Sequence, residues 1–252
     1  MGALHEGHLS LIQKSTEEND FSVVSIYVNP TQFNNSNDFT SYPRNLKMDM
    51  DIIRDYQIDV VFAPGNEEMY PEPDNRQFEF GHLENTMEGK HRPGHFSGVA
   101  KIVSKLFDII SPDRAYFGEK DFQQLAIIKK LTKNLKLPVS IIPCAIIREP
   151  DGLAMSSRNV LLNGEERKQA ANISSILFDA AERCKEYPVN IVKSWVINEI
   201  NKNPLLETEY FDIVNNDNLQ LVNKLEENHI YRGCVAVKVG KTRLIDNVEI
   251  NC

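Results

Sequence analysis

Two short apolar runs in the first quarter of the chain constrain its fold more than any other feature. Phe21–Val28 and Ile58–Phe62 are rich in β-branched residues, and each is followed by a turn that contains proline. Such runs are typical of strands that are buried on both faces of a parallel sheet. A helical pattern over Leu46–Tyr56 separates them, and parallel strands need a crossover of that kind. The sequence therefore predicts a β-α-β unit here.

The same alternation continues into the middle of the chain. An apolar stripe at helical spacing covers Val99–Ile110, and a helix predicted over Asp121–Leu135 separates strands predicted at Ala115–Phe117 and Val139–Ile147. Residues 66–96 are polar and rich in proline, glycine and asparagine, so we expect them to be irregular. Together these elements predict an α/β fold with a Rossmann-like, doubly wound parallel sheet. Ligands of such sheets bind beyond the carboxyl ends of the strands.

The pattern then changes and predicts a second, smaller domain. Two helical stretches come first, Glu165–Glu186 and Val189–Asn201, and strand-like runs follow them at Glu209–Val214, Cys234–Val239 and Arg243–Ile250. Helices followed by strands are typical of an α+β domain. We therefore predict a Rossmann-like domain over residues 1–146 and an α+β domain over residues 147–252.

Charge and cysteine content limit the classes of partner. The 252 residues carry a net charge of −8, with acidic and basic residues interspersed, so the sequence predicts no face for nucleic acid or for a membrane surface. No apolar stretch has the length of a membrane span. The four cysteines are widely separated, without a CxxC pair. We therefore expect a reduced, cytoplasmic protein without a structural metal site.

The first eight residues, MGALHEGH, place two imidazoles three residues apart at the start of a predicted helix. Side chains at this spacing can lie on one side of a helical turn, and a helix start offers unpaired N–H groups and a positive dipole end to a phosphate. His5 and His8 together could therefore stabilise a polyphosphate. Two ordinary polar surface residues would give the same spacing, and the octapeptide alone leaves both interpretations open.

Three further polar segments follow predicted strands. Asn29 and Gln32 could fix a small polar ligand through their amides, Lys120 supplies a mobile cation in FGEKD, and the MSSR loop at 155–158 combines two hydroxyls with a guanidinium. Read alone, each segment is equally an ordinary turn, a helix cap or a linker. No P-loop and no GxGxxG is present. Nucleotide binding would therefore depend on the histidine turn and the Ser-Ser-Arg loop together.

Several motifs occur together in one order along the chain. They are HxGH (5–8), NPTQF (29–33), RPGHFSG (92–98), FGEKDFQQ (117–124) and DGLAMSSRN (151–159). In this order they resemble the pantothenate synthetases, a family of the nucleotidyltransferase superfamily. The resemblance extends as far as the segment TRLIDN at 242–247.

This resemblance implies ATP-dependent condensation of pantoate with β-alanine through a pantoyl adenylate, releasing AMP and pyrophosphate. It also implies Mg²⁺ held mainly by the ATP phosphates and a homodimeric assembly. The catalytic residues would be His8, as proton donor, His5 and Lys120. Pantoate and β-alanine would be bound by Gln32 and Gln124, with Asn29. The positions that match the family's ATP-binding residues are Met1, Gly2, Ala3, Leu4, His5, Glu6, Gly7, His8, Gly118, Glu119, Lys120, Asp121, Ile147, Met155, Ser156, Ser157 and Arg158.

Members of the family carry a helical segment and a strand ending in Pro-Thr before the residue that matches Met1. We therefore expect the natural polypeptide to begin upstream, with a central first strand that this sequence lacks. Two alternatives to the predicted activity remain. One is another nucleotidyl-transferring enzyme of the same fold, including one that charges tRNA. The other is a non-catalytic ATP-binding protein, inactive because that strand is missing.

Overall fold

The computed structural model describes residues 1–251, and the chain divides into two compact units. The N-terminal unit comprises Met1–Glu119 and Gln123–Ala145. The C-terminal unit comprises Lys120–Phe122 and the chain from Ile146 onward.

The strands of the N-terminal unit form two parallel pairs. β1 (Val23–Ser25) pairs with β2 (Val60–Phe62), and β3 (Arg114–Gly118) pairs with β4 (Ser140–Cys144). Among residues 1–251 no ladder joins the two pairs. Parallel strands connected through helices confirm the predicted α/β class.

Met1 lies on the edge of β1 that faces away from β2. Its backbone nitrogen donates a hydrogen bond to the Ser25 carbonyl (2.9 Å), and the Tyr27 N–H donates to the Met1 carbonyl (2.8 Å). The Ile26 N–H, one residue along, donates to Phe62 on the other side. Because successive residues of a strand hydrogen bond to opposite sides, Met1 is a parallel neighbour of the β1 segment.

The two N-terminal strands are shorter and less buried than the sequence predicts. Phe21 and Val60 are 62% and 41% exposed, although both lie in runs predicted to be buried on both faces. That prediction is wrong for β2, because Val60 is exposed on the surface. The strand that is hydrogen-bonded to β2 is β1. Apolar composition identifies a strand but does not show whether another layer covers it.

Seven helices and three short 3₁₀ turns lie before or between these strands in the described chain. The turns are η1 (Pro30–Gln32), η2 (Gly81–Glu84) and η3 (Glu119–Asp121), and the helices are α1 (Glu6–Glu18), α2 (Ser36–Ser41), α3 (Leu46–Ile52), α4 (Asn66–Met69), α5 (Met87–His91), α6 (His95–Ile110) and α7 (Phe122–Leu135). α1 packs on β3. Residues 66–96, predicted to be irregular, contain α4, η2, α5 and the first two residues of α6.

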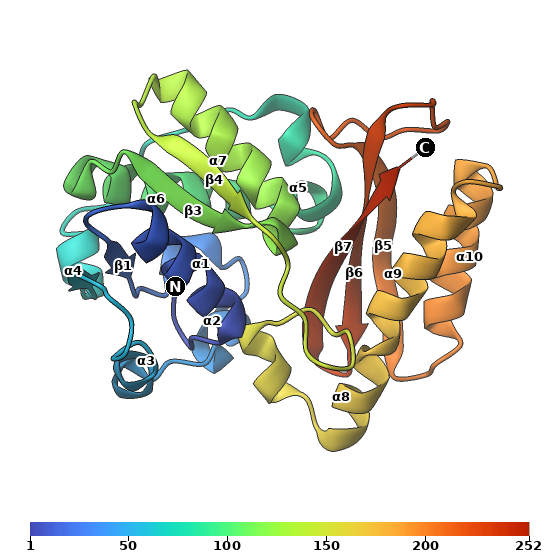
Figure 1. Ribbon diagram of the computed structural model, residues 1–252, viewed down its shortest axis with the longest axis horizontal. Coiled ribbons are helices and arrows are strands. Elements are labelled where there is room, and N and C mark those ends of the chain that lie inside the picture. The colour runs from blue at the N-terminus through green and yellow to red at the C-terminus, as the bar shows by residue number, and fades with distance from the viewer. Residues whose placement is uncertain (252) are drawn as a thin grey trace. The chain divides into compact units, whose positions relative to one another are not determined.

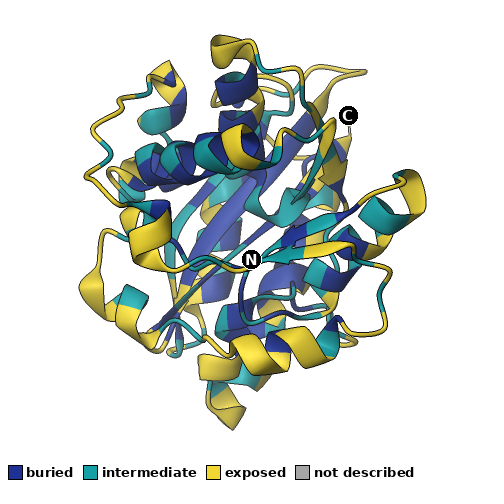
Figure 2. Cartoon of the chain, turned by 90° about the vertical axis from the view of Figure 1, so that its left-hand side faces the viewer, coloured by how far each residue is buried: buried dark blue, intermediate teal, exposed yellow. Residues whose placement is uncertain are grey.

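The C-terminal unit is an antiparallel sheet covered by helices. Its strands, β5 (Leu206–Asn215), β6 (Ile230–Val239) and β7 (Thr242–Asn251), are adjacent in chain order. α9 (Asn172–Arg183) packs on β7 and α10 (Val189–Asn201) on β5, so both helices cover the same face of the sheet (Figure 1). Burial is concentrated on the strands and the inward faces of the helices, and the exposed residues lie on outer turns and loops (Figure 2).

One predicted helix of this unit is in fact two. The pattern over Glu165–Glu186 predicts a single helix, whereas α8 (Gly164–Ala170) and α9 are separated at Ala171. Ala171 keeps helical angles (φ −60°, ψ −26°), and no glycine or proline marks the break. The three strands and α10 occur where the sequence predicts them.

Candidate functional site

The histidine turn is the start of α1. His5 is the N-cap residue, and its Nδ1 accepts a hydrogen bond from the Gly7 N–H (3.2 Å). The proton of the neutral His5 ring is therefore on Nε2. The His8 ring lies with its centroid 4.1 Å from that of His5. The structure thus brings together the two imidazoles that the spacing predicts on one side of the turn.

Asp49 holds the backbone that leads into this turn. Its carboxylate, 2% exposed at the residue level, accepts hydrogen bonds from the N–H groups of Ala3 (3.0 Å) and Leu4 (2.7 Å). Ala3 has a φ of +49°, a left-handed conformation that is strained for a residue with a side chain. Sequence reasoning missed Asp49, because a contact across some 45 residues leaves no local pattern.

The second predicted segment, the turn of Asn29 and Gln32, docks on the first turns of α6. The Asn29 amide donates to the Gly98 carbonyl (3.1 Å), and its oxygen accepts from the Tyr70 hydroxyl (2.8 Å). Asn29 is 2% exposed, so these contacts are internal and shape the turn. Gln32 is partly exposed beside it.

Gln123 and Gln124, adjacent in α7, have different surroundings. Gln123 is 4% exposed; its amide donates to the Leu83 carbonyl (2.6 Å) and its oxygen accepts from the Glu88 N–H (2.9 Å). Gln124 is only partly buried.

Gly118, another predicted site residue, ends β3, and a side chain placed there would meet no protein atom within 4 Å.

The Ser-Ser-Arg segment of the C-terminal unit follows a small hairpin. The Met155 N–H donates to the Ile147 carbonyl (3.0 Å), and the chain reverses at Gly152, whose φ of +92° favours glycine. Ser156 then caps η4 (Ser157–Leu161), its hydroxyl accepting from the Arg158 N–H (3.2 Å). This segment, for which the sequence left a plain polar linker open as the alternative, is a hairpin followed by a capped turn.

Lys120 belongs to the same C-terminal unit. The Asn247 amide of β7 donates to the Lys120 carbonyl (3.0 Å), and the Arg232 guanidinium of β6 lies 4.5 Å from the Phe122 ring centroid. The Lys120 ammonium is 3.8 Å from the Asp121 carboxylate. The sequence boundary at residue 146 counts Lys120 with the first domain, whereas its contacts tie it to the sheet that also supports η4.

A buried ion pair anchors the hairpin to that sheet. Arg148 makes a bidentate contact with Asp246 of β7 (2.7 and 3.0 Å), and the Asp246 side chain is 4% exposed. Burial raises the pKa of the Asp246 carboxyl, while the hydrogen bonds from Arg148 act in the opposite direction. The TRLIDN motif thus supplies both Asp246 and Asn247.

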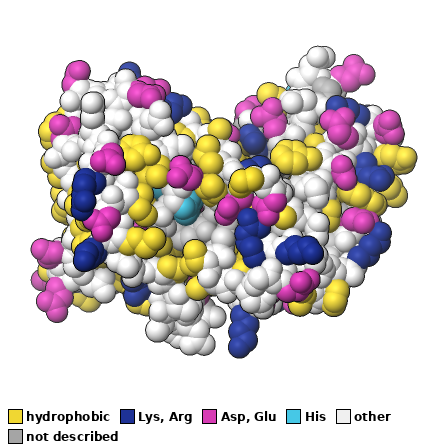
Figure 3. Space-filling view, turned by 60° about the horizontal axis from the view of Figure 1, so that its bottom comes forward, with side chains coloured by type: hydrophobic (Ala, Val, Ile, Leu, Met, Phe, Trp, Pro, Cys, Tyr) yellow, Lys and Arg dark blue, Asp and Glu magenta, His cyan; other side chains and the backbone are white. Residues whose placement is uncertain are grey.

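Charged side chains are mixed on the face seen in the space-filling view, where acidic and basic groups alternate without a continuous basic area (Figure 3). None of the described helices combines the length and the apolar character needed to cross a membrane. In residues 1–251 no three side chains of His, Cys, Asp or Glu gather as a metal site.

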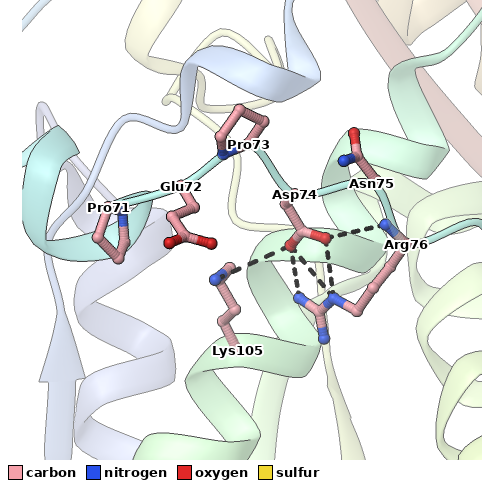
Figure 4. Close-up of a pocket in the computed structure, with 7 residues that line it drawn as sticks. All are labelled: Pro71, Glu72, Pro73, Asp74, Asn75, Arg76 and Lys105. Carbon is pink, nitrogen blue, oxygen red and sulfur yellow. Dashed lines mark hydrogen bonds and ion pairs between the residues drawn. The ribbon is translucent and has the colours of Figure 1, made fainter.

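A surface pocket of about 580 Å³ has none of the predicted site residues in its lining. Asp74 pairs there with Arg76 (2.7 Å) and Lys105 (3.9 Å), as the dashed lines in Figure 4 show. Hydrogen bonds from Arg76 lower the pKa of Asp74 to about 2. The pocket is lined by Pro71, Glu72, Pro73, Asp74, Asn75, Arg76 and Lys105. Because the buried carboxylate is already neutralised by its neighbours, the pocket is not the candidate site.

Proteins of a known family match this chain over nearly its full length. The family model of pantoate-beta-alanine ligase matches residues 1–249. The pantothenate synthetase of Bacteroides thetaiotaomicron is 49% identical over 249 residues, which cover 99% of this chain and 88% of the relative. That of Phocaeicola vulgatus is 50% identical over 250 residues, covering 99% and 89%.

Solved structures agree with this result. The crystal structure of pantothenate synthetase from Thermus thermophilus matches with a TM-score of 0.94 and 39% identity, over 100% of this chain and 91% of that one. A pantoate-beta-alanine ligase from Francisella tularensis, complexed with β-γ ATP and β-alanine, matches with a TM-score of 0.83 and 39% identity, over 98% and 86%. The chain described here belongs to the pantoate–β-alanine ligase family.

Proposed function

We propose that this chain joins pantoate to β-alanine at the expense of ATP, forming pantothenate, AMP and pyrophosphate through a pantoyl adenylate. The observation that carries the proposal is the imidazole pair at the start of α1, in a chain that matches the ligase family along its length. The complex of the Francisella tularensis relative with β-γ ATP and β-alanine supports ATP and β-alanine as ligands.

In the first step, a pantoate carboxylate oxygen attacks the α-phosphorus of ATP, and the bond from that phosphorus to the bridging oxygen breaks. Negative charge then develops on the departing pyrophosphate. His8 and His5, at a helix N-terminus, are suited to stabilise that charge, with His8 as the proton donor. Such a displacement needs positioning and electrostatics rather than a protein nucleophile.

The cations of the C-terminal unit act on the same phosphates in this proposal. Lys120 and Arg158 offset their charge, and the hydroxyls of Ser156 and Ser157 add donors. The remaining ATP contacts are proposed at Met1–His8, Gly118–Asp121, Ile147 and Met155. Support comes from the anchoring of both Lys120 and the hairpin before Ser156 to β7.

The amides of Gln32 and Gln124 are proposed to bind pantoate, with Gln32 also bordering β-alanine. Gln32 and Gln124 lie on separate elements of the N-terminal unit. Buried hydrogen bonds hold a nearby residue in each case, Asn29 for Gln32 and Gln123 for Gln124. In the second step, the amine of β-alanine attacks the acyl carbon of the adenylate, and the bond to the AMP oxygen breaks. The mixed anhydride must be kept from water between the two steps.

Mg²⁺ enters this proposal as part of the substrate MgATP. No cluster of three acidic, histidine or cysteine side chains in the described chain forms a cage for it, so the phosphates would supply its main ligands. We also propose a homodimer in the cytoplasm, on the family match over residues 1–249.

Pyrophosphate release tests the activity. The purified protein is given MgATP with pantoate, with other small carboxylic acids, or with no acid. Release that requires pantoate supports the proposal. Release with a different acid would indicate another nucleotidyl-transferring enzyme of this fold. A folded protein that binds ATP and releases no pyrophosphate with any acid would indicate a non-catalytic role.

A further inference from the structure

His95, at the start of α6, is a buried polar side chain that the proposed reaction does not use. It is 6% exposed and lies beside the turn that carries Gln32. We propose that His95 is a positioning residue for the acid-binding site: it fixes the backbone of Gln32 through a hydrogen bond whose direction Arg92 determines. This inference rests on the proposed role of Gln32 in binding pantoate.

The two ring nitrogens of His95 have different partners. Nδ1 lies 2.9 Å from the Gln32 carbonyl oxygen, and Nε2 lies 3.1 Å from an Arg92 guanidinium nitrogen. A carbonyl only accepts hydrogen bonds and a guanidinium only donates them. Both contacts are satisfied together only when Nδ1 carries the proton and Nε2 carries none. Arg92 therefore selects the tautomer that donates to Gln32.

Arg92 is held in turn by α5. Its guanidinium lies 3.6 Å from the Glu88 carboxylate, and both side chains are largely buried, at 17% and 9% exposure. The Glu88 N–H donates to the side chain of Gln123, which precedes Gln124 in α7. Polar contacts thus link the Gln32 carbonyl through His95 and Arg92 to Glu88, whose backbone N–H reaches the first turn of α7. Each proposed pantoate residue is part of this set or adjacent to it in sequence.

Close packing adds to the hydrogen bond. The missing side chain of Gly98 lets α6 approach the turn, since a Cβ there would overlap the Thr31 carbonyl oxygen and lie 2.6 Å from the Gln32 Cα. The Asn29 amide donates to the Gly98 carbonyl from the other side. The Gln32–Phe33 peptide is then held at both ends: its N–H donates to the Pro30 carbonyl (3.2 Å), and its carbonyl is the partner of His95.

Two substitutions distinguish the roles of the two ring nitrogens of His95. The amide of His95→Asn can place a donor near the position of Nδ1, whereas that of His95→Gln reaches the position of Nε2 and leaves the Gln32 carbonyl without its donor. We expect His95→Asn to keep the KM for pantoate within about threefold of wild type and His95→Gln to raise it roughly tenfold, the usual effect of one lost hydrogen bond. The KM for ATP should not change in either variant.

The measurement is steady-state pyrophosphate release with pantoate and ATP varied separately, together with thermal unfolding of each variant. His229→Asn, an exposed histidine of the C-terminal unit, is the control. Equal pantoate KM values for the two His95 variants, or parallel rises in both KM values, would overturn the positioning role while the wild type remains active. A wild type without pantoate-dependent release would overturn the proposed function, and this inference with it.

Discussion

His8 lies in the first turn of α1, where the positive end of the helix dipole favours an anionic ligand. The neighbouring His5 is the N-cap, so both imidazoles are fixed by the helix itself. A substitution at either position therefore changes the chemistry at the helix start more than it changes the core.

We expect His8→Ala to fold like wild type and to lower kcat for pantoate-dependent pyrophosphate release by a factor of about 10² or more, the range for loss of a proton donor or a transition-state contact. His229→Ala is the control for removing a histidine at an exposed site. Turnover of His8→Ala within a few fold of wild type would rule out its proposed role.

Asp74 gives a prediction on acid stability. Its pKa is lowered from 3.8 to about 2 by hydrogen bonds from Arg76, so the unfolded chain binds its proton at a higher pH than the folded chain does. The stabilisation is therefore complete above about pH 4 and is lost as the pH falls towards 2. Asp74→Asn should lower the free energy of unfolding by about 1–2 kcal/mol at pH 7 and by less at pH 3.

Chemical unfolding at both pH values measures this difference, with the exposed Asp20→Asn as the control. An Asp74→Asn deficit that stays constant between pH 7 and pH 3 would show that the Arg76 contact does not account for it.

At the scale of elements, the junction of η1 and α6 depends on the absence of a side chain at Gly98. Gly98→Ala would push the turn away from α6, because its Cβ overlaps the Thr31 carbonyl. We expect a loss of about 1–3 kcal/mol of stability, the usual cost of overpacking, with a raised KM for pantoate and an unchanged KM for ATP.

Gly164→Ala is the matched control. Gly164 is the first residue of α8, and a Cβ there meets no atom within 4 Å. Since alanine is the better helix former, this variant should be as stable as wild type or slightly more so. A Gly98→Ala protein with wild-type stability and kinetics would contradict the close packing of the turn.

Elements with a strong local pattern could be predicted from the sequence, and their surroundings could not. α10 occupies the predicted residues because its apolar residues recur at helical spacing and Pro188 marks its start. The break between α8 and α9 has no such signal, since Ala171 is itself a good helix former. Likewise the spacing predicts the contact of His5 with His8, whereas Asp49 and His95 act on backbone groups far away in the sequence.

At the scale of the molecule, the residues that we propose to act in the reaction belong to two units of the chain. The imidazoles and both pantoate amides belong to the N-terminal unit, whereas Lys120 and the Ser-Ser-Arg segment belong to the C-terminal unit. The sequence places Lys120 in the strand–turn–helix run of the first domain, because chain order does not reveal the hydrogen bond from Asn247. In the proposed reaction, the carboxylate of pantoate attacks the α-phosphorus of ATP.

The transfer of oxygen from pantoate tests that central step most directly. Pantoate labelled with ¹⁸O in both carboxylate oxygens is converted with ATP and β-alanine, and the products are analysed by mass spectrometry. Attack at the α-phosphorus predicts one ¹⁸O in AMP and one in the amide of pantothenate. Unlabelled AMP with the label in pyrophosphate, or ADP with the label in inorganic phosphate, would contradict the adenylate mechanism.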